Sequence, residues 1–208
     1  SPAAAVLSGD YWLSKAMHLL AAECKKEVLI EYAHTVSRLA EGELFQMEKA
    51  AALDTTIADY YRIIKDKTSV LFIAAMKGGA LSAEGTEAEI EAIAQYALQL
   101  GYAFQIRDDI FDYSPKMQTG KAAGADIKER KLTLPLLMAF QNATPQDVEE
   151  ITTQIARIDY NLAGNTPASE EYRAVEEIVT ARTLNFVAEH NGVALAQKAL
   201  EQHIELAM

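Results

Sequence analysis

Apolar residues recur along most of the chain at the three-to-four-residue spacing of an amphipathic α-helix, and no stretch alternates convincingly with the two-residue period of a β-strand. The clearest case is a long helix predicted over 25–53, whose apolar stripe comprises Val28, Leu29, Tyr32, Val36, Leu39 and Ala40. Further helices are predicted over 11–22, from Thr56 to about Leu81, and from about Thr86 to Tyr113. The pattern therefore predicts an all-α protein.

Short polar, proline and glycine segments mark the ends of these helices. Thr56 followed three residues later by Asp59 predicts a capping box, with Asp in place of the usual Glu or Gln. The other signals are a loop over 114–124, a short apolar helix over 132–141, helix starts at Thr144-Pro145 and Thr166-Pro167, and a helix end at Asn191-Gly192. No repeat or linker divides the chain. We expect residues 1–208 to form one domain of packed helices, truncated at both ends, because Ser1 is not a methionine and Met208 falls inside an amphipathic pattern.

Composition excludes several classes of protein. The net charge of −11 argues against a nucleic-acid partner held by bulk electrostatics. The longest apolar run, 70–76, is less than half of the roughly 18 residues that a membrane helix needs, so no integral membrane segment is expected. Cys24 is the only cysteine and no signal peptide is visible, which favours a cytoplasmic location.

The main chemical signal is Asp108, Asp109 and Asp112 on an otherwise apolar helix. Positions four apart lie on one helical face, so Asp108 and Asp112 can reach one hard cation, and Gln105 lies close to them. A bound cation would remove the repulsion between clustered carboxylates. Mg²⁺ suits this sparse set because it takes one or two carboxylates together with substrate phosphates. Without further signals, a solvated acidic face would be the simpler interpretation.

Lysines near this segment strengthen the magnesium interpretation. The loop that follows carries Gly120-Lys121, Asp126 and Lys131, and it can fold back to place ammonium groups over an anion. A solvated basic loop is the alternative. Lys67-Thr68 precedes an apolar run and can either pair with a phosphate or extend its amine to solvent.

The segment 41–46 carries a glycine within a predicted helix, which costs about 1 kcal/mol relative to alanine. Close helix packing or a kink would explain Gly42. Glu43 and Gln46 share one face and could approach the lysine or metal region, or they could form an ordinary polar helix edge.

Five segments together resemble the trans-polyprenyl diphosphate synthase family in order and spacing. They are Ala5 to Tyr11, Glu41-Gly42-Glu43, Tyr60 with Lys67-Thr68, Gly101 to Asp112, and Gly120-Lys121 through Thr133-Leu134-Pro135. The resemblance implies an isoprenoid-synthase-type helical bundle around a central cavity, here partial, and a homodimer. It also implies magnesium-assisted condensation of isopentenyl diphosphate with an allylic diphosphate to give a polyprenyl diphosphate.

The resemblance assigns roles residue by residue. Asp108, Asp109 and Asp112 match the second aspartate-rich motif, and Asp126 matches an outer-sphere metal partner. The expected catalytic residues are Lys67, Thr68, Lys121 and Lys131. These four are also expected to bind substrate, together with Glu43, Gln46, Phe104 and Gln105.

The sequence lacks the family's first aspartate-rich motif and its Arg-Arg pair. We therefore expect the chain to be the core of a longer synthase, inactive by itself. A non-catalytic or regulatory subunit of a heteromeric synthase is the alternative, although the retained aspartates and lysines count against it. A terpene cyclase or a di-iron bundle is a third reading, disfavoured because the Glu-x-x-His pairs of di-iron sites are absent. The small residues Ala74, Ala75, Gly78, Gly79 and Ala80 either leave room for a medium or long product or only allow close packing.

Overall fold

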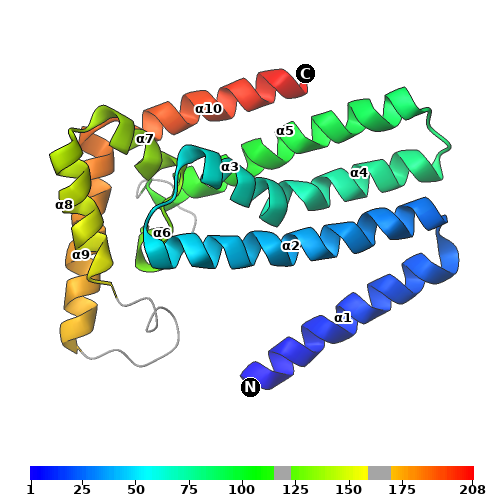
Figure 1. Cartoon of the computed structure of the whole chain (residues 1–208), viewed down its shortest axis with the longest axis horizontal. Coiled ribbons are helices and arrows are strands. Elements are labelled where there is room, and N and C mark those ends of the chain that lie inside the picture. The colour runs from blue at the N-terminus through cyan, green and yellow to red at the C-terminus, as the bar shows by residue number, and fades with distance from the viewer. Residues whose placement is uncertain (115–122, 159–169) are drawn as a thin grey trace.

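The computed structural model describes residues 1–114, 123–158 and 170–208, and the regular structure in these ranges is helical (Figure 1). In chain order the elements are α1 (Pro2–Glu23), α2 (Lys26–Ala52), α3 (Ile57–Ile64), the π-helical turn η1 (Lys65–Ser69), α4 (Val70–Ser82), α5 (Glu87–Asp112), α6 (Ala125–Lys128), α7 (Leu134–Asn142), α8 (Pro145–Ala156), α9 (Glu170–Glu189) and α10 (Gly192–Ala207). The predicted all-α class is confirmed.

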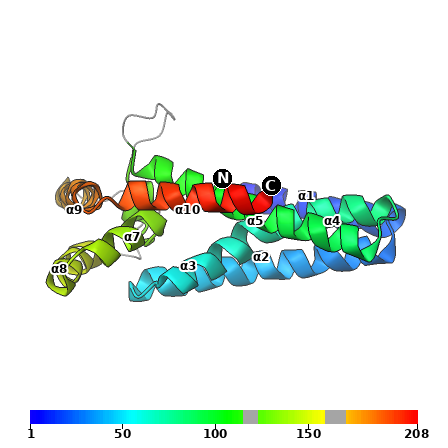
Figure 2. The same ribbon diagram turned by 90° about the horizontal axis from the view of Figure 1, so that it is seen from above.

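Three long helices, α2, α4 and α5, run side by side, and α10 lies along α5 (Figures 1 and 2). At one end, α8 and α9 pair with each other and run across the direction of the long helices. The helix α1 packs only lightly on α2, and none of its residues is buried. None of the helices in the described ranges is long and apolar enough to cross a membrane.

The main hydrophobic core lies where α5, α7, α8, α9 and α10 meet. Its fully buried side chains include Ile106, Leu134, Leu136, Ile155 and Val187. Each buried side chain of this size contributes about 1.5–3 kcal/mol by leaving water. The core therefore holds the C-terminal half of α5, which carries the aspartates, firmly against the α6–α7 segment.

The predicted helix ends are confirmed where local hydrogen bonds define them. The Thr56 hydroxyl accepts from the Asp59 amide at 3.1 Å, while the Asp59 carboxylate accepts from the Thr56 amide at 3.0 Å. The first helix was predicted too short. It begins at Pro2 rather than Tyr11, because the Ser1 side chain accepts from the Ala4 amide and proline favours a first turn.

One further expectation changes. Residues from Thr56 to Leu81 do not form one helix, because η1 separates α3 from α4. Asn191 closes α9 in a left-handed conformation, as predicted for a helix end, and the separate helix α10 follows it. The predicted start at Thr166-Pro167 lies outside the described residues.

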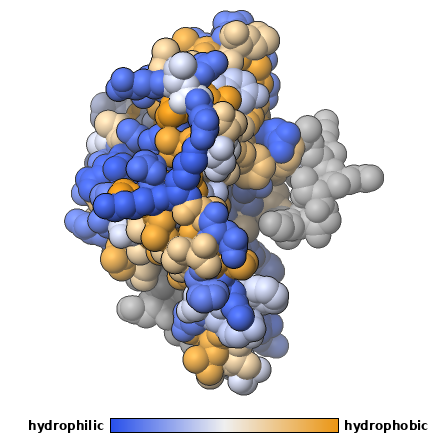
Figure 3. Space-filling view, turned by 90° about the vertical axis from the view of Figure 1, so that its right-hand side faces the viewer, coloured by the Kyte–Doolittle hydropathy of each residue, from blue (hydrophilic) through white to orange (hydrophobic). Residues whose placement is uncertain are grey.

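The surface at the end of the bundle where α1 joins α2 and α4 joins α5 is of mixed character. Hydrophobic residues are interleaved there with hydrophilic ones (Figure 3).

The small residues of α4 differ in burial. Ala74 and Gly78 are buried, whereas Ala75 and Gly79 are exposed. Gly78 packs against Tyr32, so close packing explains at least part of this glycine- and alanine-rich stretch.

Candidate functional site

A cavity of about 210 Å³ opens between α2, α3, η1, α5 and the segment that joins α6 to α7. Carboxylates and lysines from elements far apart in the sequence share its wall. The lining residues are Gln46, Ala50, Thr55, Tyr60, Ile63, Ile64, Lys67, Gln105, Asp108, Asp109, Asp126, Lys131, Leu132 and Thr133. The cavity thus brings together most of the residues that the sequence singled out.

The two adjacent aspartates of α5 have different surroundings. Asp109 is 4% exposed, and it accepts a 2.6 Å hydrogen bond from the Tyr60 hydroxyl and a 2.9 Å bond from the Gln105 amide. Asp108 is exposed at the cavity wall, and no described side chain donates a hydrogen bond to it. Neighbouring residues point about 100° apart on a helix, so burying Asp109 turns Asp108 outward. Asp108 is therefore the carboxylate most available to a cation.

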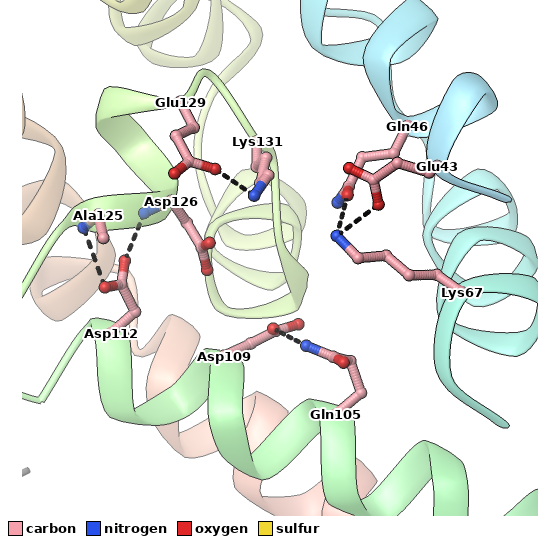
Figure 4. Close-up of polar contacts among 10 residues, drawn as sticks. All are labelled: Glu43, Gln46, Lys67, Gln105, Asp109, Asp112, Ala125, Asp126, Glu129 and Lys131. Carbon is pink, nitrogen blue, oxygen red and sulfur yellow. Dashed lines mark hydrogen bonds and ion pairs between the residues drawn. The ribbon is translucent and has the colours of Figure 1, made fainter. Parts of the chain in front are cut away.

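Asp112, one turn further along α5, holds the next helix in place. Its two carboxylate oxygens accept from the backbone amides of Ala125 and Asp126, each at 2.9 Å (Figure 4). These amides open α6 and would otherwise lack an acceptor. Asp112 does not line the cavity itself, but its hydrogen bonds place the Asp126 side chain there.

The carboxylates of buried Asp109 and half-buried Asp126 have little positive charge nearby to stabilise them. Burial raises the pKa of Asp109 to about 7, partly opposed by the hydrogen bonds from Tyr60 and Gln105. Burial, followed by the negative charges of Asp109 and Asp112, raises the pKa of Asp126 to about 8. A cation in the cavity would lower the free energy of both charged forms.

The opposite wall carries Lys67. Its ammonium group donates to the side-chain oxygen of Gln46 at 2.5 Å and forms a 3.0 Å ion pair with Glu43, both on α2 (Figure 4). The next residue, Thr68, turns toward α5 and donates from its hydroxyl to Gln105 at 2.7 Å. The expectation that Glu43 and Gln46 share a face near this lysine is confirmed.

Lys131 faces the aspartates from the α6–α7 segment and forms an ion pair with Glu129. Burial lowers the pKa of Lys131, but the hydrogen bond and negative charge of Glu129, together with Asp126 and Glu43, outweigh burial and raise the pKa above its usual value. The lysine is therefore cationic where it meets the cavity.

Three further predicted site residues differ in what the structure says of them. Lys121 lies outside the described residues. Phe104 is 44% exposed, packs against Phe72 and does not line the cavity. Gln105 lines the cavity as expected, but it bonds Asp109, four residues along the helix, rather than Asp108. Tyr60 was missed as a site residue, although its position before Lys67-Thr68 was a usable signal.

The donor set fits a hard cation. Asp108, Asp109 and Asp126 offer only oxygen ligands, which Mg²⁺ prefers. Within residues 1–114, 123–158 and 170–208, no three carboxylate, imidazole or thiol groups converge closely enough to hold a metal by themselves. Mg²⁺ usually keeps several waters and takes further ligands from a substrate phosphate, so a sparse carboxylate wall is compatible with it.

Comparison with known proteins agrees with this site. Over 200 residues the chain is 36% identical to octaprenyl diphosphate synthase of Haemophilus influenzae, covering 96% of this chain and 58% of that protein. It is 37% identical over 154 residues to octaprenyl diphosphate synthase of Escherichia coli, covering 74% of this chain and 48% of the relative. The chain therefore spans about half the length of these relatives.

Solved structures show the same fold. The polyprenyl synthase from Caulobacter crescentus CB15, complexed with calcium and isoprenyl diphosphate, superposes with a TM-score of 0.81 at 30% identity, over 99% of this chain and 58% of that one. A geranylgeranyl pyrophosphate synthase from Bacteroides thetaiotaomicron gives 0.80 at 29% identity, over 97% and 62%. The predicted isoprenoid-synthase fold is confirmed. Since the profile of the family described as polyprenyl synthetase matches residues 1–171, the chain belongs to that family of trans-isoprenyl diphosphate synthases.

Proposed function

We propose that this chain provides the allylic-diphosphate half of a prenyltransferase site, which condenses isopentenyl diphosphate onto an allylic diphosphate. One observation carries the proposal: the aspartates of α5 and two lysines from opposite walls face a single cavity. The acidic side suits divalent cations and the lysines suit phosphate oxygens. The relatives named diphosphate synthases support the same reaction class.

Lys67 and Lys131 would each contact diphosphate oxygens as compact positive charges. Lys67 now donates to Glu43, whose side chain is half exposed, so a diphosphate oxygen could replace that carboxylate at little cost. Lys121 is proposed as a third contact, by resemblance alone. Asp108 and Asp109, with Asp126 acting through water, would hold Mg²⁺ beside the same diphosphate.

The reaction needs stabilisation of a leaving group rather than a protein nucleophile. Bound Mg²⁺ would supply positive charge to the departing diphosphate. The lysines would add to this field as the carbon–oxygen bond breaks and an allylic cation forms. The double bond of isopentenyl diphosphate then forms the new carbon–carbon bond, and the released diphosphate accepts the proton that the product loses.

We also propose an oligomeric state, a cellular location and a class of product. The homodimer rests on the family resemblance, and the cytoplasmic location rests on the single cysteine, Cys24. The medium or long polyprenyl product is supported by the relatives named octaprenyl diphosphate synthases. No specific observation favours a regulatory subunit. A cavity lined by aspartates and lysines would serve a non-catalytic subunit poorly.

Calorimetric titration of the 208-residue chain with geranyl diphosphate tests the proposal. We expect binding that requires Mg²⁺ and weakens about tenfold or more in Lys67→Met and in Asp108→Asn, because each removes a charge-assisted contact. Lys198→Met on α10 and Asp10→Asn on α1 are matched controls, since both residues are exposed and neither lines the cavity. Affinity that is independent of Mg²⁺, or unchanged in Lys67→Met, would contradict the proposal.

A further inference from the structure

The helical turn that carries Lys67 and Thr68 contains one residue more than an α-helical turn. In η1 the Val70 amide donates to the Lys65 carbonyl, five residues back, and the Ser69 hydroxyl donates to the Ile64 carbonyl at 3.3 Å, again five back. Such π-turns are rare, are usually a single turn long, and often lie at functional sites. Here the wider turn sends Lys67 toward α2 and Thr68 toward α5.

Two glycines hold this turn from opposite sides. A Cβ added to Gly42 on α2 would lie 2.8 Å from the Lys67 amide nitrogen and 2.9 Å from the Asp66 carbonyl carbon. A Cβ added to Gly101 on α5 would lie 2.6 Å from the Ser69 Cα. All three distances are too short for real atoms, so the backbone of η1 fits only because neither glycine has a side chain.

An ion pair gives the same turn a second contact with α2. Asp66 is 7% exposed, and its carboxylate accepts from the Arg38 Nε at 3.0 Å and from a second, closer guanidinium nitrogen. A buried carboxylate without its partner is strongly unfavourable, so Asp66 is tied to α2. Since Asp66 precedes Lys67, the tie limits rotation of the turn that carries the lysine.

We propose that Arg38 and Asp66, together with Gly42 and Gly101, are positioning residues that set the ammonium of Lys67 and the hydroxyl of Thr68 at the diphosphate site. Neither Arg38 nor Asp66 lines the cavity, so they act only through the turn. The inference rests on the proposed function for its ligand, but not for the placement of Lys67.

The placement is measured without any ligand. Acetylation of lysines in the whole chain by N-hydroxysuccinimidyl acetate, followed by mass spectrometry, reports the reactivity of the Lys67 amine relative to that of Lys77. We expect several-fold faster Lys67 labelling in Gly42→Ala and in Asp66→Asn, because the amine loses its contacts with Gln46 and Glu43. Gly79→Ala is the matched control, since a Cβ there meets nothing within 4 Å.

The functional consequence is measured with Mg²⁺ and inorganic diphosphate in a calorimeter. We expect Gly42→Ala to weaken binding about tenfold, and to weaken it no further in a Lys67→Met chain, because its effect passes through that lysine. Arg38→Gln replaces a partly exposed side chain, and it is expected to act in the same direction if Gly42→Ala does not fold.

The outcomes distinguish the positioning role from the proposed function. Lys67 labelling at the wild-type rate in Asp66→Asn and in the folded Gly42→Ala or Arg38→Gln chain would overturn the positioning role. An equal loss of affinity with and without Lys67 would also overturn it. If the wild-type chain does not bind diphosphate while the labelling differences remain, the proposed function fails and the positioning role stands.

Discussion

The hydroxyl of Tyr60 on α3 donates a 2.6 Å hydrogen bond to the buried carboxylate of Asp109 on α5. Burial, followed by the charge of Asp109, raises the pKa of Tyr60 well above its usual value, so the phenol stays protonated and remains the donor. Gln105 donates to the other oxygen of the same carboxylate at 2.9 Å. These two hydrogen bonds hold Asp109, rather than the adjacent Asp108, in the inward orientation.

Tyr60→Phe should destabilise the chain by about 1–3 kcal/mol, because the Asp109 carboxylate loses a donor that water cannot readily replace. Urea denaturation followed by circular dichroism measures the change. Tyr96→Phe, which alters a 41% exposed tyrosine on the same helix as Asp109, should change stability by less than about 0.5 kcal/mol. Equal midpoints for the two variants would show that the hydrogen bond does not stabilise the fold.

Asp112→Ala should loosen the start of α6, since the Ala125 and Asp126 amides lose their carboxylate acceptors. Hydrogen–deuterium exchange should report faster exchange at these two amides, with little change in α10. Asp108→Asn is the control, because the Asp108 side chain accepts no hydrogen bond from the described residues. Unchanged protection in Asp112→Ala would mean that α6 is held by its other contacts alone.

Gly192→Ala should destabilise the junction of α7 and α10. An added Cβ would overlap the Pro135 carbonyl oxygen and lie 3.0 Å from the Ala139 Cβ, so the two helices would have to separate. The expected cost is about 1–3 kcal/mol in the free energy of unfolding. The control, Gly79→Ala, should be neutral or stabilising by up to about 1 kcal/mol, because that site is open and alanine favours a helix.

His203 should make stability depend on pH. It contacts Gln99 at 2.7 Å and Tyr61 at 3.1 Å, and burial lowers the pKa of its imidazole below the usual value. The unfolded chain then binds a proton more readily than the folded chain, so stability is greatest above pH about 6.5 and falls as pH drops toward the lowered pKa.

His203→Phe keeps an aromatic ring against Tyr61 while removing the titration. The melting temperature of this variant should depend less steeply on pH between about 5 and 7 than that of the wild type. His18→Phe, on exposed α1, should leave the slope unchanged. Parallel curves for the wild type and His203→Phe would assign the pH dependence to other groups.

The chain alone should not turn over isopentenyl diphosphate and geranyl diphosphate. Its sequence contains one Asp-Asp-x-x-Asp and no Arg-Arg pair, and the family resemblance implies that the reaction needs a second aspartate motif and the arginine pair as well. Incorporation of radiolabelled isopentenyl diphosphate measures this directly. Sustained product formation by the purified chain would refute the expectation, and with it the idea that a second carboxylate wall is required.

The sequence alone predicts features that depend on residues close together in the chain. The capping box of Thr56 and Asp59 and the proline after Thr144 depend on atoms a few residues apart, so those helix ends follow from the sequence alone. The helical period likewise predicted α2 and α5 nearly to the residue. The aspartates and lysines predicted a site for a metal-bound diphosphate, because carboxylate oxygens suit a hard cation and ammonium groups suit phosphate oxygens.

Tertiary structure decided what each of those residues does. Asp108 and Asp109 are the same residue type side by side, and only the packing of Tyr60 against α5, across 49 positions of sequence, makes one a buried acceptor and leaves the other at the cavity. The π-turn at Lys67 likewise depends on Gly42 and Gly101 from two other helices. Helical periodicity specifies a face, whereas burial depends on which distant segment covers that face.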